Sequence, residues 1–166
     1  EGDLRYKSKE YDVAIKKYKI GCSSGYTDAC IKIGKMYKFG QGTDKNPKKA
    51  FEYYNHACKT KDTEACFQLA IMFETGEGTN VDLKKSEQIY KDGCQKNHAG
   101  SCGQYGSKLI NAGDPEAGFS FVEMACKKEN LVGCFALATL YNTGSGIDMD
   151  LTKAFKHFDF VCQKDG

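Results

Sequence analysis

The sequence contains no long apolar run and no excess of charge of one sign. None of its apolar segments approaches the roughly 18 residues that a membrane-spanning helix needs. Its 24 basic and 22 acidic residues are mixed along the chain and leave a formal net charge of +2. A nucleic-acid track or a membrane-surface patch would need a block of basic residues. We therefore expect no membrane span and no nucleic-acid partner. No charged leader with an apolar core begins at Glu1, so we expect any signal peptide to be already removed.

The common hydrolase motifs are also missing. A serine β-lactamase pairs a serine with a lysine three positions later and adds S-D-N and K-T-G elements. Neither element occurs, and no H-E-x-x-H or G-x-S-x-G segment occurs either. The serines at positions 86, 101, 107 and 120 are followed three positions later by Ile89, Gln104, Ile110 and Glu123. The sequence therefore identifies no catalytic residue.

The titratable side chains outside these motifs are histidines and scattered carboxylates. The histidines are His56, His98 and His157, which fall at unrelated positions. We interpret them as solvated residues of helices or turns. The carboxylates considered for acid–base chemistry are Glu64, Glu74 and Glu123. They could do such work only where a pocket raises their pKa, and otherwise they belong to solvated helix faces.

What the chain does have is cysteine, nine residues in all. Eight of them form pairs eight positions apart: Cys22 and Cys30, Cys58 and Cys66, Cys94 and Cys102, Cys126 and Cys134. Structural zinc sites usually space paired ligands two to four residues apart and add histidine or further cysteine nearby. The fixed, longer interval favours disulfides, and hence an oxidising compartment, over a metal site. Cys162 follows without a partner before Gly166.

The cysteine pairs belong to an internal repeat. Cys22, Cys58 and Cys94 are 36 residues apart, the next step to Cys126 is 32 residues, and the step to Cys162 is 36 again. A period of this length is typical of a solenoid. We divide the chain, as a single repeat array, into a partial first unit at residues 1–26 and further units at 27–62, 63–98, 99–130 and 131–166.

Each unit has the pattern of a helical hairpin. The segment "TDACIKIGKMYKFG" places Cys30, Ile33, Gly34 and Tyr37 at helical spacing, and the turn "GQGTDKN" follows it. The segment "PKKAFEYYNHAC" then places Ala50, Phe51, Tyr54, Ala57 and Cys58 on one face, with Pro47 at the first helical position. The small residues would let the helices approach closely, and one hairpin cannot bury these faces alone.

Two segments depart from this pattern. The turn "INAGD" lacks four residues that the other turns contain, so we expect it to be tight. The opening segment "GDLRYKSKEYDVAI" fits the same short form, which places Glu1 inside a first helix.

The residues "AC..LA..FETGEGTNVDLKKS..IY..GC" resemble Sel1-like repeats, which are relatives of the tetratricopeptide repeat. The cysteine pair in each unit is similar to the Helicobacter cysteine-rich protein family. The resemblance covers nearly the whole chain. It implies an all-α fold, a right-handed α-solenoid of helix hairpins stapled by disulfides, in a secreted or periplasmic protein. Members of that family are associated with binding or slow hydrolysis of β-lactams.

In such an array the end of one helix lies close to the start of the next, and eight residues suit that approach. We therefore expect four local disulfides, each between the second helix of one unit and the first helix of the next. Each closed loop would contribute about 2.5 kcal/mol in the chain-entropy model. Cys162 is left unpaired, and its repeat partner would fall at position 170. We expect the natural protein to continue, because a terminal repeat normally needs a cap.

The resemblance also implies that the first helix of each hairpin lines a concave groove. The groove positions vary between units, whereas the framework positions hardly change. They are Ile31, Lys35 and Lys38; Phe67, Ile71 and Glu74; Gly103, Ser107 and Ile110; and Phe135, Thr139 and Asn142. Apolar side chains would anchor a ligand, and the lysines would contact a carboxylate.

From these features we expect a monomeric repeat scaffold, without cofactor or metal, that binds a peptide, a protein or a peptidoglycan-type cell-wall fragment in this groove. The alternative is a weak β-lactam-binding protein or β-lactamase-like hydrolase, which rests on the family resemblance alone. A further alternative is a purely structural or assembly factor.

Overall fold

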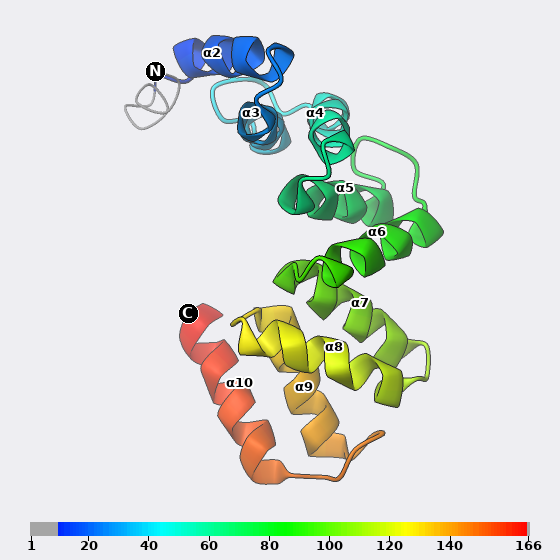
Figure 1. Ribbon diagram of the computed structural model, residues 1–166. Coiled ribbons are helices and arrows are strands. Elements are labelled where there is room, and N and C mark those ends of the chain that lie inside the picture. The colour runs from blue at the N-terminus through cyan, green and yellow to red at the C-terminus, as the bar shows by residue number, and fades with distance from the viewer. Residues whose placement is uncertain (1–9, 166) are drawn as a thin grey trace. The chain divides into compact units, whose positions relative to one another are not determined.

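The computed structural model describes residues 10–165, which form α-helices and no strand. The helices follow one another in antiparallel hairpins (Figure 1). Their bounds are α2 Tyr11–Ser23, α3 Thr27–Phe39, α4 Pro47–Lys59, α5 Thr63–Thr75, α6 Leu83–Gln95, α7 Ala99–Asn111, α8 Pro115–Lys127, α9 Leu131–Thr143 and α10 Leu151–Asp165. The expected helix at Glu1 lies outside the described residues. None of the described helices is long and apolar enough to cross a membrane.

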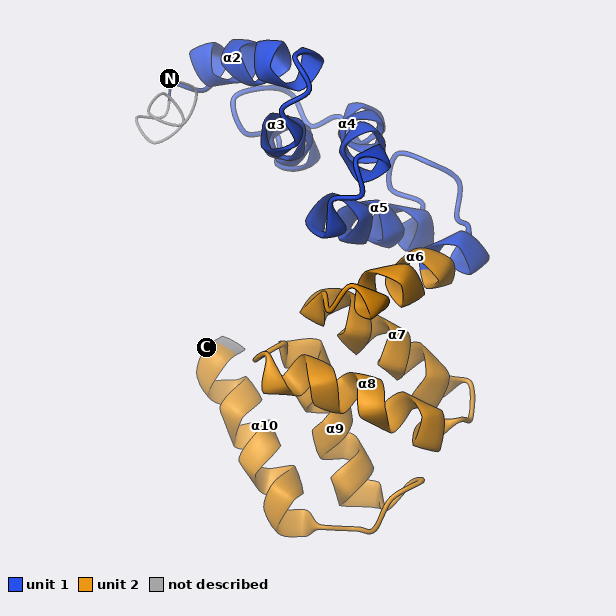
Figure 2. Ribbon diagram, in the orientation of Figure 1, with its two compact units in different colours: residues 1–86 blue, residues 87–166 orange. Residues whose placement is uncertain are grey.

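The chain divides into two compact units, residues 1–86 and residues 87–166, and the boundary falls within α6 (Figure 2). In unit 1, consecutive helices pack together, α2 on α3, α3 on α4, and α4 on α5. In unit 2, α7 packs on α8 and α9, α8 packs on α9, and α9 packs on α10.

The small residues of the repeat set the distance between packed helices. A Cβ built on Gly34 of α3 would come within 3.1 Å of the Tyr54 ring of α4, so a larger residue there would require that ring to shift by a few tenths of an ångström. Ala50 and Ala57 are completely buried on the same face of α4. The aromatic side chains fill the remaining space, as the repeat pattern predicts, with Tyr37 and Tyr54 both buried.

Side-chain caps determine where most helices begin. Asp62 Oδ1 accepts a hydrogen bond from the Ala65 amide at 2.8 Å, and Asn130 Oδ1 accepts one from the Gly133 amide at 3.0 Å. Asn46 and Asp114 cap α4 and α8 in the same way, each followed by proline at the first helical turn. Such caps typically contribute about 1 kcal/mol.

Two kinds of turn follow the first helix of a hairpin. Residues 40–46, 76–82 and 144–150 follow α3, α5 and α9, and each begins with a glycine in the left-handed conformation. After α7 only residues 112–114 intervene before α8, which confirms the tight turn expected at "INAGD".

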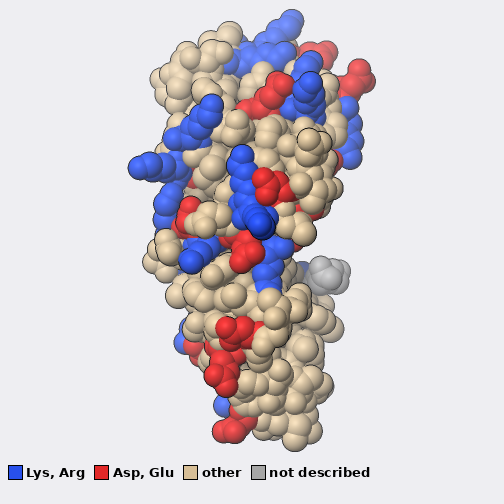
Figure 3. Space-filling model, turned by 90° about the vertical axis from the view of Figure 1, so that its right-hand side faces the viewer, with Lys and Arg blue, Asp and Glu red and all other residues tan. Residues whose placement is uncertain are grey.

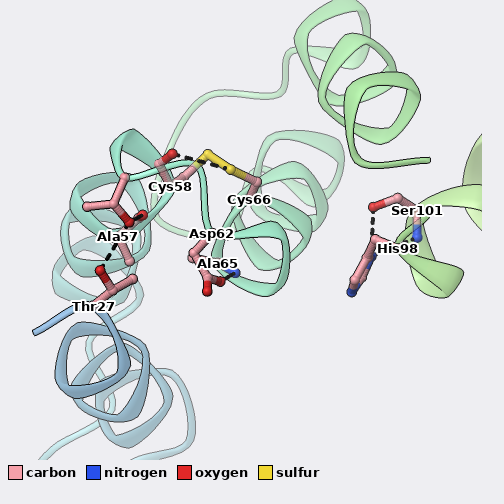
Figure 4. Close-up of a disulfide and its surroundings, with 9 residues drawn as sticks. Thr27, Ala57, Cys58, Asp62, Ala65, Cys66, His98 and Ser101 are labelled. Atoms are coloured by element: carbon pink, nitrogen blue, oxygen red, sulfur yellow. Dashed lines mark hydrogen bonds between the residues drawn. A yellow bond between two sulfur atoms is a disulfide. The ribbon is translucent and has the colours of Figure 1, made fainter. Parts of the chain in front are cut away.

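Four disulfides join the end of each second helix to the start of the next first helix: Cys22–Cys30, Cys58–Cys66, Cys94–Cys102 and Cys126–Cys134. Their Cα–Cα distances run from 4.4 to 4.7 Å. Figure 4 shows the second of these bridges, with the Asp62 cap inside its loop. The expected pairing is confirmed, and Cys162 is an exposed free cysteine. Disulfides of this kind are typical of an oxidising, extracytoplasmic environment.

Candidate functional site

A cleft of about 440 Å³ opens in unit 1 between the first helices α3 and α5. Two predicted groove residues, Ile31 and Lys35, line its α3 side. The buried ring of Tyr54 reaches it from α4. The other lining residues are Asp28, Lys32, Phe39, Glu64 and Gln68. The cleft therefore combines apolar walls with charges of both signs at its rim.

Polar side chains at this cleft are held by neighbours on the same or the facing helix. Lys32 Nζ lies 3.1 Å from Asp28 Oδ2, one helical turn away. Gln68 Nε2 donates to Glu64 Oε1 at 2.9 Å, and Gln68 Oε1 accepts a hydrogen bond from Lys38 Nζ at 3.1 Å. The last bond crosses from α3 to α5 and positions the predicted groove residue Lys38 beside the cleft.

The phenol of Tyr54 remains protonated at physiological pH. Burial raises its pKa well above the ordinary value, and the Glu64 and Glu77 carboxylates add to the effect. Its hydroxyl is thus neutral under ordinary conditions, so Tyr54 contributes an aromatic wall and no charge.

The other predicted groove residues differ in exposure. Phe135 is 56% exposed, and its ring meets the edge of Phe158 with centroids 5.6 Å apart. Thr139 is exposed, and its hydroxyl donates to the Phe135 carbonyl within α9 at 3.0 Å. Asn142 is exposed, whereas the remaining four are half-buried: Phe67, Ile71, Glu74 and Ser107.

Two positions that the repeat alignment assigns to the groove serve packing in unit 2. A Cβ on the buried Gly103 would lie 2.5 Å from Asn130 Oδ1, so α7 can approach the start of α9 only without a side chain there. Ile110 packs against the core cluster of Val122, Leu137 and Leu140.

The interpretation of the histidines as solvated is wrong for two of the three. His98 Nδ1 accepts the Ser101 amide at 3.1 Å and lies 2.9 Å from the Ser101 hydroxyl (Figure 4), so His98 caps α7 where Asp62 and Asn130 cap their own helices. His157 is half-buried, with Nδ1 3.5 Å from Cys126 Sγ. His56 is exposed.

Two of the disulfides have a histidine close by. The ligand atoms of Cys22, Cys30 and His56 lie within 4.8 Å of one another, and so do those of Cys126, Cys134 and His157. Zinc binds cysteine as thiolate. Because both sulfur pairs are joined in disulfides, neither cluster offers thiolates to a metal in this state.

The carboxylates considered for acid–base work have ordinary partners. Glu64 accepts from Gln68, as described, and Glu123 Oε2 lies 3.0 Å from Lys127 Nζ one helical turn away. In Figure 3, lysines lie beside acidic side chains over the upper half of the face, whereas acidic side chains predominate over the lower half.

Sequence reasoning missed several residues of the site. Tyr54 was assigned only to the hairpin core, although its ring also borders the cleft. The contact between His157 and Cys126 was missed as well, yet a signal was present. The repeat places Tyr53 and Phe121 at the position of His157, so a polar ring replaces an aromatic one there.

Comparison with known proteins identifies the repeat. The family model of the Sel1 repeat matches residues 27–59, 63–98, 94–130 and 131–160. The structure of a Sel1 repeat protein from Oxalobacter formigenes is similar over 99% of this chain and 69% of its own, with a TM-score of 0.87 and 23% identity. A protective antigen of uropathogenic Escherichia coli is similar over 94% of this chain and 34% of its own, with a TM-score of 0.84 and 20% identity.

Helicobacter pylori cysteine-rich protein B is also among the similar structures, at 20% identity over 92% of this chain and 91% of its own, with a TM-score of 0.33. No curated protein sequence matches this chain. The fold is shown by the Oxalobacter formigenes and Escherichia coli structures, at 23% and 20% identity.

Proposed function

Because this chain belongs to the Sel1 repeat family, whose repeats are protein-interaction modules, we propose that it is a secreted or periplasmic scaffold that binds an extended peptide segment along its first helices. The four disulfides support the compartment, since disulfides form and persist mainly in oxidising surroundings. The observation that carries the binding proposal is the cleft between α3 and α5.

The cleft has the features of a side-chain pocket for an extended ligand. Its volume of about 440 Å³ lies within the roughly 300 to 1,000 Å³ of common ligand sites. Ile31 and Tyr54 provide apolar walls, and Phe39 is 59% exposed at the rim. Ligand pockets are commonly lined by apolar and aromatic side chains of this kind with a few polar groups beside them. One apolar side chain of a ligand would therefore occupy the cleft.

The charges at the rim favour an acidic neighbour to that side chain. Lys35 is exposed at the cleft, and Lys38 lies beside it on α3. Lys32 is already paired with Asp28, so Lys35 is the better placed to meet a carboxylate of the ligand. In unit 2, the exposed Phe135 and Asn142 supply a similar apolar and polar pair on α9.

Phage-displayed short random peptides, selected on the oxidised protein, test this function. Selected peptides should pair an apolar residue with Asp or Glu. Ile31→Ala should weaken their binding by about 1 to 3 kcal/mol, as for an interface anchor. Lys35→Glu should weaken it too and remove most of its salt dependence. A muropeptide mixture run in parallel distinguishes a cell-wall ligand from a peptide.

Matched variants keep this test specific. Ile20 is 64% exposed on α2 and Lys48 is exposed on α4, and neither lines the cleft. Ile20→Ala and Lys48→Glu should leave binding unchanged. Because Ile31 also packs against the Cys22–Cys30 cluster, thermal melting must show that Ile31→Ala is folded. Selected peptides that bind all four variants as tightly as the parent would exclude the cleft.

A further inference from the structure

The last disulfide of the chain lies beside an open cleft in unit 2. This cleft has a volume of about 320 Å³ and is bordered by α8, α9 and α10. Cys126 is half-buried and lines it, whereas Cys134 is completely buried. A reagent in the cleft can therefore reach the Cys126 sulfur and not the Cys134 sulfur.

A histidine is in contact with the accessible sulfur. His157 Nδ1 lies 3.5 Å from Cys126 Sγ, and the imidazole stacks on Tyr141 with ring centroids 6.1 Å apart and planes inclined by 7°. Two of the repeat equivalents of His157, Tyr53 and Phe121, have rings without a basic nitrogen. Tyr53 packs against the Cys22–Cys30 cluster, and Phe121 packs against the Cys94–Cys102 cluster.

The groups that face this sulfur favour a thiolate. Besides His157, the charged or titratable residues at the cleft are Glu123 and Lys127 from α8, Tyr141 from α9, and Lys153 and Lys156 from α10. Glu123 is offset by Lys127, 3.0 Å away. Lys153 is paired with Asp150, 3.2 Å away, and burial and Lys156 lower the pKa of His157. Lys156, and the His157 imidazole once it takes up a proton, are therefore the groups that would lower the pKa of the Cys126 thiol and increase its reactivity. The Cys94–Cys102 bridge has both sulfurs buried, with Phe121 and Met124 packed against it.

We propose that Cys126–Cys134 is a thiol–disulfide exchange site, in which Cys126 is the exchanging sulfur, His157 stabilises its thiolate, and the substrates are dithiols or disulfides that enter the cleft. His56 also lies near the Cys22–Cys30 bridge, but both of those cysteines are buried. This activity is separate from peptide binding in unit 1.

The exchange proceeds in two displacements. A thiolate of the dithiol attacks Cys126 Sγ and breaks the Cys126–Cys134 bond, and Cys134 leaves as a thiolate and takes up one proton. Its sulfur lies 3.6 Å from the Cys126 carbonyl oxygen, which can accept the new S–H. The second thiolate of the dithiol then attacks the dithiol sulfur that is bonded to Cys126 Sγ. That bond breaks, the dithiol closes to a disulfide, and Cys126 leaves as a thiolate with the bonding electron pair.

The products balance the dithiol that is consumed. The dithiol loses two electrons and two protons and becomes a disulfide. The sulfurs of Cys126 and Cys134 gain the two electrons as the bond between them breaks. One proton ends on Cys134 and the other on the imidazole of His157, beside the Cys126 thiolate. In the reverse direction, the Cys126 thiolate attacks a substrate disulfide.

Equilibration with reduced and oxidised dithiothreitol tests the site in a Cys162→Ser chain, which lacks the exposed free thiol. Differential alkylation and peptide mass analysis give the reduced fraction of each cysteine pair. We expect the equilibrium constant for reduction of Cys126–Cys134 to exceed that of Cys94–Cys102 by about tenfold, or about 30 mV. Equal constants for the two pairs would overturn the proposal.

Two reciprocal substitutions assign the effect to the imidazole. His157→Phe, which installs the residue of the preceding repeat, should bring Cys126–Cys134 to the constant of Cys94–Cys102. Phe121→His should raise the constant of Cys94–Cys102 instead. If His157→Phe fails to fold by circular dichroism, the Phe121→His chain decides, and an unchanged constant there counts against the proposal.

A kinetic measurement separates thiolate stabilisation from a packing effect. In the reduced Cys162→Ser chain, the iodoacetamide alkylation rate of Cys126 should reach half its maximum at a pH below the roughly 8.5 of an ordinary cysteine. His157→Phe should return the midpoint to about 8.5 or above. A midpoint that is the same in both chains contradicts the role given to His157.

Discussion

Ser86 is the buried polar side chain whose replacement we expect to stabilise the protein. Its side chain is completely buried in α6, and its Oγ has no hydrogen-bond partner among residues 10–165. The repeat places small apolar residues at the equivalent positions, which are Ala14, Ala50, Gly118 and Ala154. Ser86→Ala therefore removes one oxygen atom and restores the residue that most repeats contain.

The gain can be calculated from two contributions. A buried hydroxyl without a partner costs about 1 to 3 kcal/mol relative to its hydrated state. Alanine is also the better helix former, by up to about 0.5 kcal/mol. The cavity left by one oxygen offsets part of this. We expect the free energy of unfolding to rise by about 1 to 2 kcal/mol, which is a few degrees in Tm for a chain of this length.

Urea denaturation of the oxidised protein, followed by far-UV circular dichroism, measures this change. Ala50→Ser is the mirror substitution, since Ala50 is also completely buried, and it should lower stability by a similar amount. A loss of stability in Ser86→Ala would refute the reasoning, because it would mean that the hydroxyl makes a stabilising bond in the folded state.

The remaining predictions concern strained turns and pH. Lys61 and Glu129 adopt φ values of 67° and 59°, at the repeat position that Gly25 occupies. Lys61→Gly should therefore raise the free energy of unfolding by about 1 kcal/mol in urea denaturation, and Gly25→Lys should lower it; equal stabilities would show that the turn is not strained. Burial, and then the Lys156 charge, lower the pKa of His157 in the folded protein. Below the ordinary histidine pKa of about 6.5, the unfolded chain therefore binds more protons at residue 157 than the folded chain does. Stability should thus fall as the pH drops below about 6.5, and His157→Phe should show a smaller fall in urea titrations over that range; parallel pH profiles would contradict this.

Local features of the repeat were predictable from the sequence. The disulfide pairs lie eight residues apart, and a turn between consecutive helices brings them together without help from distant residues. The caps, the proline starts and the glycine turns are local as well, since each depends on residues within about one helical turn. The short turn after α7 could be identified by counting residues between equivalent positions.

The groove was predictable only in part. The alignment placed Ile31 and Lys35 at the cleft, because equivalent positions of a repeat face the same way. It also placed Gly103 and Ile110 in the groove, yet Gly103 lies against the start of α9 and Ile110 packs into the core. A repeat position that has no side chain, or whose side chain packs inward, cannot contact a ligand in the groove. The spacing of the repeats does not predict which positions are of this kind.

The sequence by itself therefore determined the helices, the turns and the disulfides, because these depend on neighbours along the chain. Only the tertiary structure decided that Tyr54 borders a cleft. It also decided that His157 Nδ1 contacts Cys126 Sγ, although the two residues are 31 positions apart in the sequence. Such contacts depend on how each helix is rotated and how closely it packs on its neighbour. That is set by the combined side-chain volumes of several helices and is not encoded in any one segment.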